Sequence, residues 1–404
     1  MTSEHALTIN AGSSTIKVGA FAIDSGTPEP LGKIVVELRN APLPIRVIPV
    51  HGQPYEASWT APADDFEGIV RLLVPTIREA FAISSFLVVG HRIVHGGLDF
   101  RGPVAVRTPN LDRIKALIPL APLHQHQGAR LIEAIGHVCP GILQTASFDT
   151  TFHLTLAPEA RRFAIPRDLH EVGVRRYGFH GISYAHIARA LARDAPDLAR
   201  GRVVVAHLGN GASLCALDGG VSKDTTMGFS TLDGVPMGTR CGALDPGALL
   251  YLLKSRGMSA GEIETLLYER SGLSGLSGIS SDVRVLQADK TMAAAETLDV
   301  FTFHIARNVA ALATTLQGLD GLVFTGGIGE HNPGIRAAVC ARLRWLGVRL
   351  DENANTTNAM RIQSPESGVA VLVIPADEEQ QIAADAVSIL HGRTKSTKAT
   401  GGFA

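Results

Sequence analysis

Two short glycine hairpins, about one domain length apart, constrain the fold of this chain more than any other feature. The first passes from an apolar run at residues 6–10 through a Gly-Ser-Ser turn at 12–14 into a second strand-like run. The other passes from a β-branched run at 203–206 through a Gly-Asn-Gly turn at 209–211 into a further strand-like run. Because strand, turn and strand recur in both halves, the sequence predicts a duplicated architecture.

Helical and strand-like patterns alternate along the rest of the chain. Apolar strand-like runs such as 86–90, 322–325 and 369–374 stand between segments of helical periodicity. This alternation predicts the α/β class, and 404 residues suffice for two or three folding units. The predicted helices cover residues 65–81, 125–135, 183–192, 246–256, 260–271, 294–319 and, from an Asn-Pro start, 332 to about 347.

Charge and cysteine content limit the kind of partner. The chain has 37 Lys and Arg residues against 38 Asp and Glu residues, a formal net charge of −1, which argues against binding to nucleic acid or a membrane surface. Its 4 cysteines form no C-x-x-C pair, and its N-terminal segment lacks a basic region followed by a long apolar run. These features predict a cytoplasmic chain without a disulfide framework, export signal or membrane span.

The first hairpin has the composition of a phosphate-binding loop. Small side chains let the backbone approach a phosphate closely, and Ser13, Ser14 and Thr15 would add hydroxyl donors, with Lys17 adding positive charge. An ordinary Gly-Ser hairpin with a solvated lysine fits the same residues equally well. There is no Walker A loop, and no G-x-G-x-x-G follows a strand-like run.

Two further glycine segments extend the phosphate-binding prediction. The segment at 207–211 could hold the other phosphates of a nucleotide, although an Asn-Gly turn alone would give the same pattern. The segment at 326–330 runs toward a helix start, which suits an adenosine or phosphate group. This third pattern is common in other proteins and is weak evidence alone. The two hairpins, one from each half, could together hold the phosphates of a nucleoside triphosphate.

Charged residues stand at the ends of several strand-like runs. Arg92 follows the run at 86–90, and Arg240 lies among glycines and small residues; either could bind a carboxylate or phosphate, or form a structural ion pair. Asp149 and His180 lie in segments with apolar neighbours. Each could be a functional group or a hydrogen-bonded polar group of the core. His124 and His126 form an H-x-H pair, but no third ligand is spaced to complete a zinc site.

Eight motifs in sequence order are far more specific together than any one of them alone. They are NAGSSTIK, GHRIVHGG, FDTTFH, RRYGFHGIS, HLGNGAS, MGTRCG, GGIGE and IPADEE. With these motifs, from residue 7 to about 390, the chain resembles the acetate kinase family. The resemblance implies two duplicated actin/Hsp70-like (ribonuclease H-like) domains of the α/β class around a nucleotide cleft.

The resemblance also implies the reaction and the domain limits. The activity would be reversible, Mg²⁺-dependent transfer of a phosphoryl group from ATP to acetate, giving ADP and acetyl phosphate, with Mn²⁺ as a substitute ion. An N-terminal domain would span 1–149, with a helix at 383–391 packed on it. A nucleotide-binding and dimerisation domain would span 150–382, making the chain a homodimer, and 392–404 would be a disordered tail.

The catalytic residues follow from the same resemblance. Arg92 and Arg240 would hold the acetate carboxylate and balance charge on the moving phosphoryl group. His180 would donate a hydrogen bond to that group, with His124 nearby, and Asp149 would orient the reacting groups. The magnesium-linked residues would be Asn10 and Glu378, with the adjacent Glu379 less suited.

The binding residues complete the set. The pocket for the acetate methyl group would be lined by Val94, Leu123, Phe179 and Thr231. The nucleotide would contact Ser13, Thr15, Lys17, His207, Leu208, Gly209, Asn210, Gly211, Asp282, Val283, Arg284, Gly327, Ile328, Gly329, Glu330 and His331.

Four positions depart from the family pattern. Gln125-His126 replaces the usual Asn-Pro, His331 replaces a common asparagine, and Thr231 replaces a common proline in the acyl pocket. Because one methylene in an apolar pocket changes binding by only about 1–3 kcal/mol, a propionate or other short-chain acyl kinase is the alternative. An ATP-gated binding module of the Hsp70 or actin type is a further alternative, since the fold alone does not fix the function.

Overall fold

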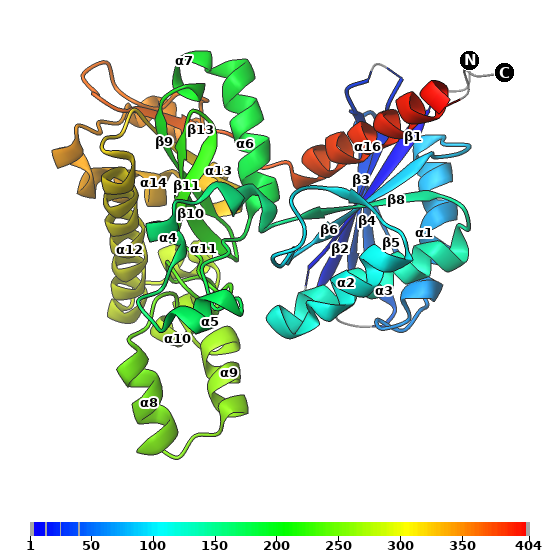
Figure 1. Cartoon of the computed structure of the whole chain (residues 1–404). Helices are drawn as coiled ribbons and strands as arrows, with labels where there is room; N and C mark the ends of the chain where they lie inside the picture. The colour runs from blue at the N-terminus through cyan, green and yellow to red at the C-terminus, as the bar shows by residue number, and fades with distance from the viewer. Residues whose placement is uncertain (1–3, 13, 25, 39–40, 401–404) are drawn as a thin grey trace. The chain divides into compact units, whose positions relative to one another are not determined.

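The computed structural model divides the chain into two compact units (Figure 1). Unit 1 comprises Met1–Phe152 and Asp377–Ala404, and unit 2 comprises His153–Ala376. The structure describes residues 4–12, 14–24, 26–38 and 41–400, without the side chains of Leu123 and residues 393–400. The domain limits expected from the family resemblance, after residues 149 and 382, stay a prediction.

An eight-stranded mixed sheet forms the centre of unit 1. Its strand order is β5-β4-β3-β2-β1-β6-β8-β7. From β1 to β5 the strands form an antiparallel meander, and β1, β6 and β8 are parallel neighbours. The strands are β1 (His5–Ala11), β2 (Thr15–Ala22), β3 (Glu29–Glu37), β4 (Leu43–Pro49), β5 (Tyr55–Trp59), β6 (Val88–Ile93), β7 (Val104–Ala105) and β8 (Leu143–Phe148).

Helices cover both faces of this sheet because successive residues of a buried strand point to opposite faces. Leu7 packs in a core with residues of α1 (Phe66–Phe81) and α3 (Pro122–Val138). Its neighbour Ala6 packs instead with residues of α16 (Glu378–Thr400). The remaining helices of unit 1 are α2 (Thr108–Ala116) and the short 3₁₀ segment η1 (Ile118–Leu120), and a second 3₁₀ segment, η2 (Thr151–Thr155), joins the units.

The position of α16 depends on a close approach to the sheet. A methyl group at Gly90 on β6 would lie 2.7 Å from Cγ2 of Ile382, so a larger residue would push the helix away. The Ser147 hydroxyl on β8 donates to the Asp385 carboxylate on α16 at 2.9 Å. These contacts fix the first turns of α16 over β6 and β8. The predicted tail at 392–404 overlaps the end of this helix, and its last four residues lie outside the described part of the chain.

Unit 2 contains a five-stranded mixed sheet with the order β11-β10-β9-β12-β13. The strands are β9 (Arg202–Leu208), β10 (Ala212–Asp218), β11 (Val221–Thr225), β12 (Gly321–Thr325) and β13 (Ala370–Val373). The long helix α12 (Met292–Leu316) packs on β9, β10 and β11. The other segments are α4 (Pro158–Arg161), α5 (Arg167–Glu171), α6 (Gly181–Asp194), α7 (Pro196–Ala199), α8 (Pro246–Lys254), α9 (Ala260–Glu269), α10 (Gly272–Ser277), α11 (Val283–Ala288), α13 (Gly326–His331), α14 (Pro333–Arg342), η3 (Arg344–Leu346) and α15 (Glu352–Thr356).

The two sheets share one strand plan. In unit 1 the run β3-β2-β1-β6-β8 and in unit 2 the run β11-β10-β9-β12-β13 each combine two antiparallel pairings with two parallel ones, in the same order. The predicted duplicated α/β fold is therefore confirmed. Within the described residues, no helix combines the length and apolar character needed to cross a bilayer.

Candidate active site

The functional residues of unit 1 gather at one edge of its sheet. Asn10 lies near the end of β1, Arg92 near the end of β6, and Asp149 directly after β8. Since these strands are parallel neighbours, their carboxyl ends meet at the same edge, which is where open α/β sheets bind ligands. The first turn of α16 adds Glu378 and Glu379 to this edge.

Arg92 is the centre of this cluster. Its Nη2 donates to Oδ2 of Asp149 at 2.7 Å, and its Nε donates to the same oxygen at 3.1 Å. Its Nη1 donates to Oδ1 of Asn10 at 2.9 Å and lies 3.6 Å from Oε2 of Glu378. A guanidinium held on two sides in this way keeps one orientation, as a binding site for an anion requires.

Asn10 links the arginine to the two glutamates. Its Nδ2 donates to Oε2 of Glu378 at 2.8 Å and to Oε1 of Glu379 at 3.1 Å. The amide orientation is determined by chemistry, because only the NH₂ group can face two carboxylates and only the oxygen can face the guanidinium. Asn10 is 4% exposed, so this orientation is also held by packing.

Burial and neighbouring charges shift the pKa values in the cluster. Burial raises the pKa of the Asp149 carboxyl to about 6; Arg92 opposes this shift and Glu378 adds to it. Burial and the adjacent Glu378 raise the pKa of Glu379. For Arg92, burial alone would lower the pKa of the guanidinium, but Asp149 and Glu378 outweigh it and raise that pKa.

The donor set at this edge suits a magnesium ion. No group of three or more His, Cys, Asp or Glu side chains able to hold a metal occurs among the described residues. Mg²⁺ in nucleotide enzymes, however, takes one or two carboxylates together with phosphates and water, and Glu378 and Glu379 supply two neighbouring carboxylates. Because the oxygen of Asn10 accepts from Arg92, Asn10 fits a role in orienting these glutamates.

The other predicted residues of unit 1 occupy its turns and loops. Thr15 begins β2, and Lys17 lies opposite Asn10 in the register of β1 and β2. Ser13 lies outside the described residues. Val94 is buried directly after β6. Leu123 and His124 belong to the first turn of α3, and the Leu123 side chain is outside the described part.

The unusual Gln125 has a clear structural role. Its side-chain oxygen accepts from the backbone N–H of His95 at 3.0 Å, and its Nε2 donates to the His95 carbonyl at 3.0 Å. This reciprocal pair fixes the loop after β6, which contains Val94, to the start of α3. The residue that departs from the family pattern therefore connects two predicted substrate-binding segments.

In unit 2, a second group of polar residues surrounds the β9–β10 turn. A methyl group at Gly211 would lie 3.4 Å from Nε2 of His180 and 3.9 Å from Nη1 of Arg240. The two side chains therefore converge on the Gly211 α-carbon. At the same turn, a methyl group at Gly238 would lie 2.4 Å from Oδ1 of Asn210, so this glycine allows the loop around Arg240 to approach.

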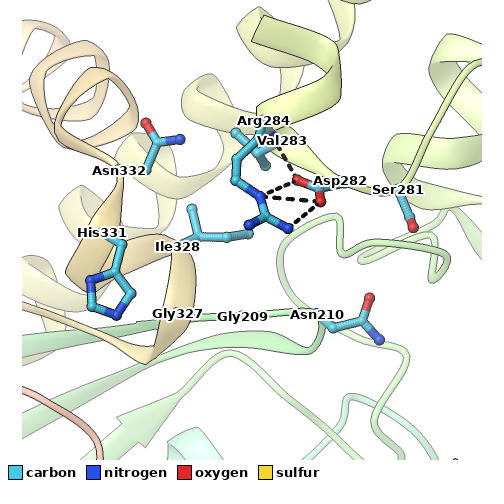
Figure 2. A pocket seen from close by; sticks show the side chains of 10 residues that line it. All are labelled: Gly209, Asn210, Ser281, Asp282, Val283, Arg284, Gly327, Ile328, His331 and Asn332. Atoms are coloured by element: carbon cyan, nitrogen blue, oxygen red, sulfur yellow. Dashed lines mark hydrogen bonds and ion pairs between the residues drawn. The ribbon is translucent and has the colours of Figure 1, made fainter. Parts of the chain in front are cut away.

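A cavity of about 440 Å³ begins at the same turn (Figure 2). Its volume lies in the range of small-molecule sites. Residues from three segments of unit 2 line it: the β9–β10 turn, the start of α11, and α13 with the residue after it. They are Gly209, Asn210, Ser281, Asp282, Val283, Arg284, Gly327, Ile328, His331 and Asn332.

The cavity wall is held by caps and ion pairs. Asp282 caps α11 by accepting from the backbone N–H of Arg284 at 2.8 Å, and the Arg284 side chain donates to the same carboxylate, as Figure 2 shows. On the opposite wall, Asn332 caps α14 and exchanges two hydrogen bonds with Gln287. Ser281 and Asn332 were not among the predicted site residues, although the Asn-Pro helix start was recognised.

A buried arginine holds the helix α13 in place. Arg336 is 0% exposed and donates to the carbonyls of Gly329 and Glu330 at 2.8 and 2.9 Å. It also donates to the side chain of Asn355 at 2.8 Å. Gly326 has φ +77°, and a methyl group there would lie 2.8 Å from the Leu208 carbonyl, so α13 packs tightly on the end of β9.

The remaining predicted residues of unit 2 lie around these groups. His207 and Leu208 end β9, and the rings of His207 and His180 stack with centroids 4.4 Å apart. Phe179 is buried, and the Thr231 carbonyl accepts from Nη1 of Arg240 at 3.4 Å. His331 lies on the cavity wall and Glu330 accepts from the backbone N–H of Ala376.

Comparisons with known proteins identify the family. The sequence model described as the acetokinase family matches residues 5–384. An acetate kinase of Methylocella silvestris is 44% identical over 394 residues, covering 95% of this chain and 97% of its own. An acetate kinase of Rhodopseudomonas palustris is 46% identical over 386 residues, covering 93% and 96%.

Solved structures agree with this result. A propionate kinase from Francisella tularensis superposes with a TM-score of 0.88 at 32% identity, covering 96% of this chain and 100% of its own. An acetate kinase from Porphyromonas gingivalis superposes with a TM-score of 0.87 at 33% identity, with the same coverage. With its duplicated α/β fold, the chain belongs to the acetokinase family, and its resemblance to that family is confirmed.

Proposed function

We propose that this protein transfers the γ-phosphoryl group of ATP to acetate in a reversible, direct in-line reaction. A carboxylate oxygen of acetate forms a bond to the γ-phosphorus while the bond from that phosphorus to the β–γ bridging oxygen breaks. The electron pair of the broken bond leaves with ADP, and the other product is acetyl phosphate. Such a transfer depends on positioning and on charge neutralisation more than on covalent chemistry.

One observation carries this proposal. Nε2 of His180 and Nη1 of Arg240 converge on Gly211, in the turn whose Gly209 and Asn210 line the 440 Å³ cavity. A nucleotide with its adenosine part between α11 and α13 would direct its phosphates toward this turn. The two donors would then stabilise the charge on the transferred group.

Unit 1 would provide the groups for the acceptor and the metal. Arg92 would bind the acetate carboxylate, with Asp149 and Asn10 holding the guanidinium in place. Glu378 and Glu379 would hold Mg²⁺, which when bound neutralises charge on the phosphates. Mn²⁺, which has similar ligand preferences, would substitute for it.

Acetate is the proposed acceptor, and propionate is the alternative. The names of the curated relatives support acetate, whereas the Francisella structure is titled a propionate kinase. The choice between acetate and propionate would depend on the size of the acyl pocket. Thr231, which replaces the usual proline there, would affect that size. Val94 in unit 1 and Phe179 in unit 2 are both apolar and buried.

A hydroxamate assay tests the proposal. Purified protein is incubated with Mg-ATP and acetate, propionate or butyrate, and acyl phosphate is trapped with hydroxylamine. Acyl phosphate formed preferentially from acetate supports acetate kinase activity, and a preference for propionate supports the alternative. Failure of every acid to yield acyl phosphate, with ATP turnover stimulated by a polypeptide instead, would support a binding module and overturn the proposal.

We further propose that the protein is a cytoplasmic homodimer. The helix α8 has no buried residue, and Leu250, Tyr251 and Leu253 on it are 51%, 55% and 37% exposed. A second copy of the chain would cover these apolar side chains. The substrate ATP and four free thiols fit a reducing compartment. Light scattering should give twice the chain mass of 42.7 kDa, and a monomer mass would contradict the dimer.

A further inference from the structure

The hydrogen-bond network behind His180 determines which of its ring nitrogens carries the proton. Nδ1 of His180 lies 2.8 Å from the hydroxyl of Ser213 on β10, and that hydroxyl lies 2.5 Å from the Tyr184 hydroxyl on α6. Ser213 and Tyr184 are both 0% exposed. Tyr184, Ser213 and His180 thus form a continuous chain of polar groups that ends at the predicted phosphate-binding turn.

The direction of the protons in this chain follows from the chemistry of the two hydroxyl groups. A phenol is a stronger hydrogen-bond donor and a weaker acceptor than an aliphatic alcohol, so Tyr184 donates to Ser213. Burial also raises the pKa of Tyr184 well above its usual value, which keeps the phenol protonated. With its oxygen accepting from Tyr184, the Ser213 hydroxyl is able to donate its own hydrogen to Nδ1 of His180.

The surroundings of His180 also favour a neutral ring. His180 is the N-cap residue of the 14-residue helix α6, with φ +58°. The positive end of a helix dipole disfavours a cation at this position. The ring of His207 stacks on that of His180 at 28°, and two stacked imidazolium ions would repel each other. The neutral ring then carries its single proton on Nε2.

The tautomer decides whether His180 presents a hydrogen or a lone pair at the phosphate-binding turn. Nε2 faces the Gly211 α-carbon, on which Nη1 of Arg240 also converges. In the Nε2–H tautomer, His180 presents a hydrogen to a phosphoryl oxygen at this point. In the other tautomer it would present a lone pair, which repels an anionic oxygen.

We infer that Tyr184 and Ser213 are positioning residues that hold His180 as the Nε2–H tautomer and thereby make it a hydrogen-bond donor to the transferred phosphoryl group. The part about the phosphoryl group rests on the proposed function; the part about the tautomer does not. Neither residue touches the reacting atoms, and both act through His180.

Nitrogen-15 NMR of the full-length protein labelled at histidine tests the tautomer directly. The His180→Gln variant assigns the His180 signal among the 15 histidines. His153 is an internal reference, because its Nε2 lies 3.0 Å from the Phe179 carbonyl, an acceptor that requires Nε2–H, and its Nδ1 lies 2.9 Å from the Ser222 hydroxyl. Wild-type His180 should show the same protonated Nε2 and unprotonated Nδ1 at pH 7.5.

Two nearly isosteric variants test whether Ser213 and Tyr184 set the tautomer of His180. In Ser213→Ala, His180 should become a mixture of tautomers, and kcat for acyl phosphate formation should fall about tenfold to a hundredfold with ATP affinity retained. In Tyr184→Phe, where the Ser213 hydroxyl is still present, the decrease should be smaller. Ser222→Ala, which removes an equally buried hydroxyl from His153, is the matched control and should leave kcat unchanged.

A double-mutant comparison separates positioning from a general structural effect. In a His180→Gln background, Ser213→Ala should have no additional effect on kcat, because the tautomer no longer exists. An undiminished effect in that background, a wild-type His180 protonated on Nδ1, or a doubly protonated ring at pH 7.5 would each overturn the inference. If the wild type forms no acyl phosphate, the proposed function fails, while the NMR result still decides the tautomer.

Discussion

Asn10 and Glu378 lie 368 positions apart in the chain, yet Nδ2 of Asn10 donates to Oε2 of Glu378 at 2.8 Å. This bond joins the end of β1 to the first turn of α16, and the same amide accepts from Arg92 through its oxygen. Asn10 thus spaces the arginine from the glutamates and fixes the positions of both charges.

Removal of this link should reduce activity through misplacement of the charges. We predict that Asn10→Ala lowers kcat about a hundredfold and increases the Mg²⁺ concentration required for half-maximal rate. Steady-state kinetics over a magnesium titration measures both effects. Asn110→Ala, which removes another asparagine hydrogen bond within unit 1, is the control. A magnesium dependence identical to that of the wild type would contradict the role of Asn10.

The two site arginines should be needed for turnover but not for nucleotide binding. We predict that Arg92→Ala or Arg240→Ala lowers kcat about a thousandfold or more, because the first removes the cation that would bind the acetate carboxylate and the second removes a cation placed for the transferred group. Calorimetric titration should show ATP affinity within several-fold of the wild type. The exposed Arg71→Ala, which removes only an ion pair along α1, should behave as wild type. Near-normal kcat in either site variant would refute the assignment.

Arg336 should support both stability and nucleotide affinity. Arg336→Met leaves the carbonyls of Gly329 and Glu330 without their buried donor, and we predict a loss of about 3 kcal/mol in the free energy of unfolding. The KM for ATP should rise because α13 forms part of the cavity wall. In the control Arg361→Met, the exposed pair with Asp197 is lost at a cost below about 1 kcal/mol. Equal unfolding free energies for the two variants would argue against this role.

Three buried histidines should lower the free energy of unfolding in mild acid. Burial lowers the pKa of His91, His95 and His153 to about 4 each. Since the unfolded imidazoles titrate near 6.5, the unfolded state binds more protons below that pH, and the free energy of unfolding falls between about pH 6.5 and 4. The full shift corresponds to about 3 kcal/mol per histidine.

Urea unfolding at a series of pH values from 7.5 to 4.5 measures this dependence. His153→Gln should make the unfolding free energy less dependent on pH, whereas the same substitution at the exposed His51 is the control. An unfolding free energy that stays constant from pH 6.5 to 4.5 would show that these rings are not held neutral.

Thr231 should influence the choice of acyl group. Its backbone carbonyl accepts from Arg240, so Thr231→Ala shortens the side chain without removing that contact. We predict that the kcat/KM ratio of propionate to acetate rises by up to about tenfold. Thr314→Ala, on the exposed face of α12, should leave the ratio unchanged. An unchanged ratio in Thr231→Ala would place the selectivity elsewhere.

Local patterns predicted the frame of the fold well. The helix predicted over 65–81 is α1, because an Asp65 cap and a regular apolar spacing mark it. Strands β3 to β5 were missed. The alternation of buried and exposed positions in β4 is too brief to be distinguished from a loop, and β5 has no such alternation, because its residues before Trp59 are all exposed. The predicted helix from residue 332 to about 347 ends at Arg342 and is followed by a 3₁₀ turn. The glycine expected to end the helix, Gly347 with φ +89°, ends the 3₁₀ turn.

The site was predicted in parts. Residues next to glycine turns or at strand ends, such as Arg92 and Asn210, carry local signals. Ser213, Tyr184 and Gln125 carry none, because a serine in a strand or a tyrosine in a helix acquires its role only when folding brings it to a histidine or a loop. Such partners depend on tertiary contacts that a single sequence does not encode locally.

The most direct test of the proposed reaction is phosphorus-31 NMR of the protein with Mg-ATP and acetate. If the protein catalyses the proposed transfer, the γ-phosphate signal of ATP decreases while acetyl phosphate and ADP increase in equal amounts, and ADP and acetyl phosphate added alone regenerate ATP. Release of inorganic phosphate without acetyl phosphate, or ATP that stays unchanged in the presence of acetate, would contradict it.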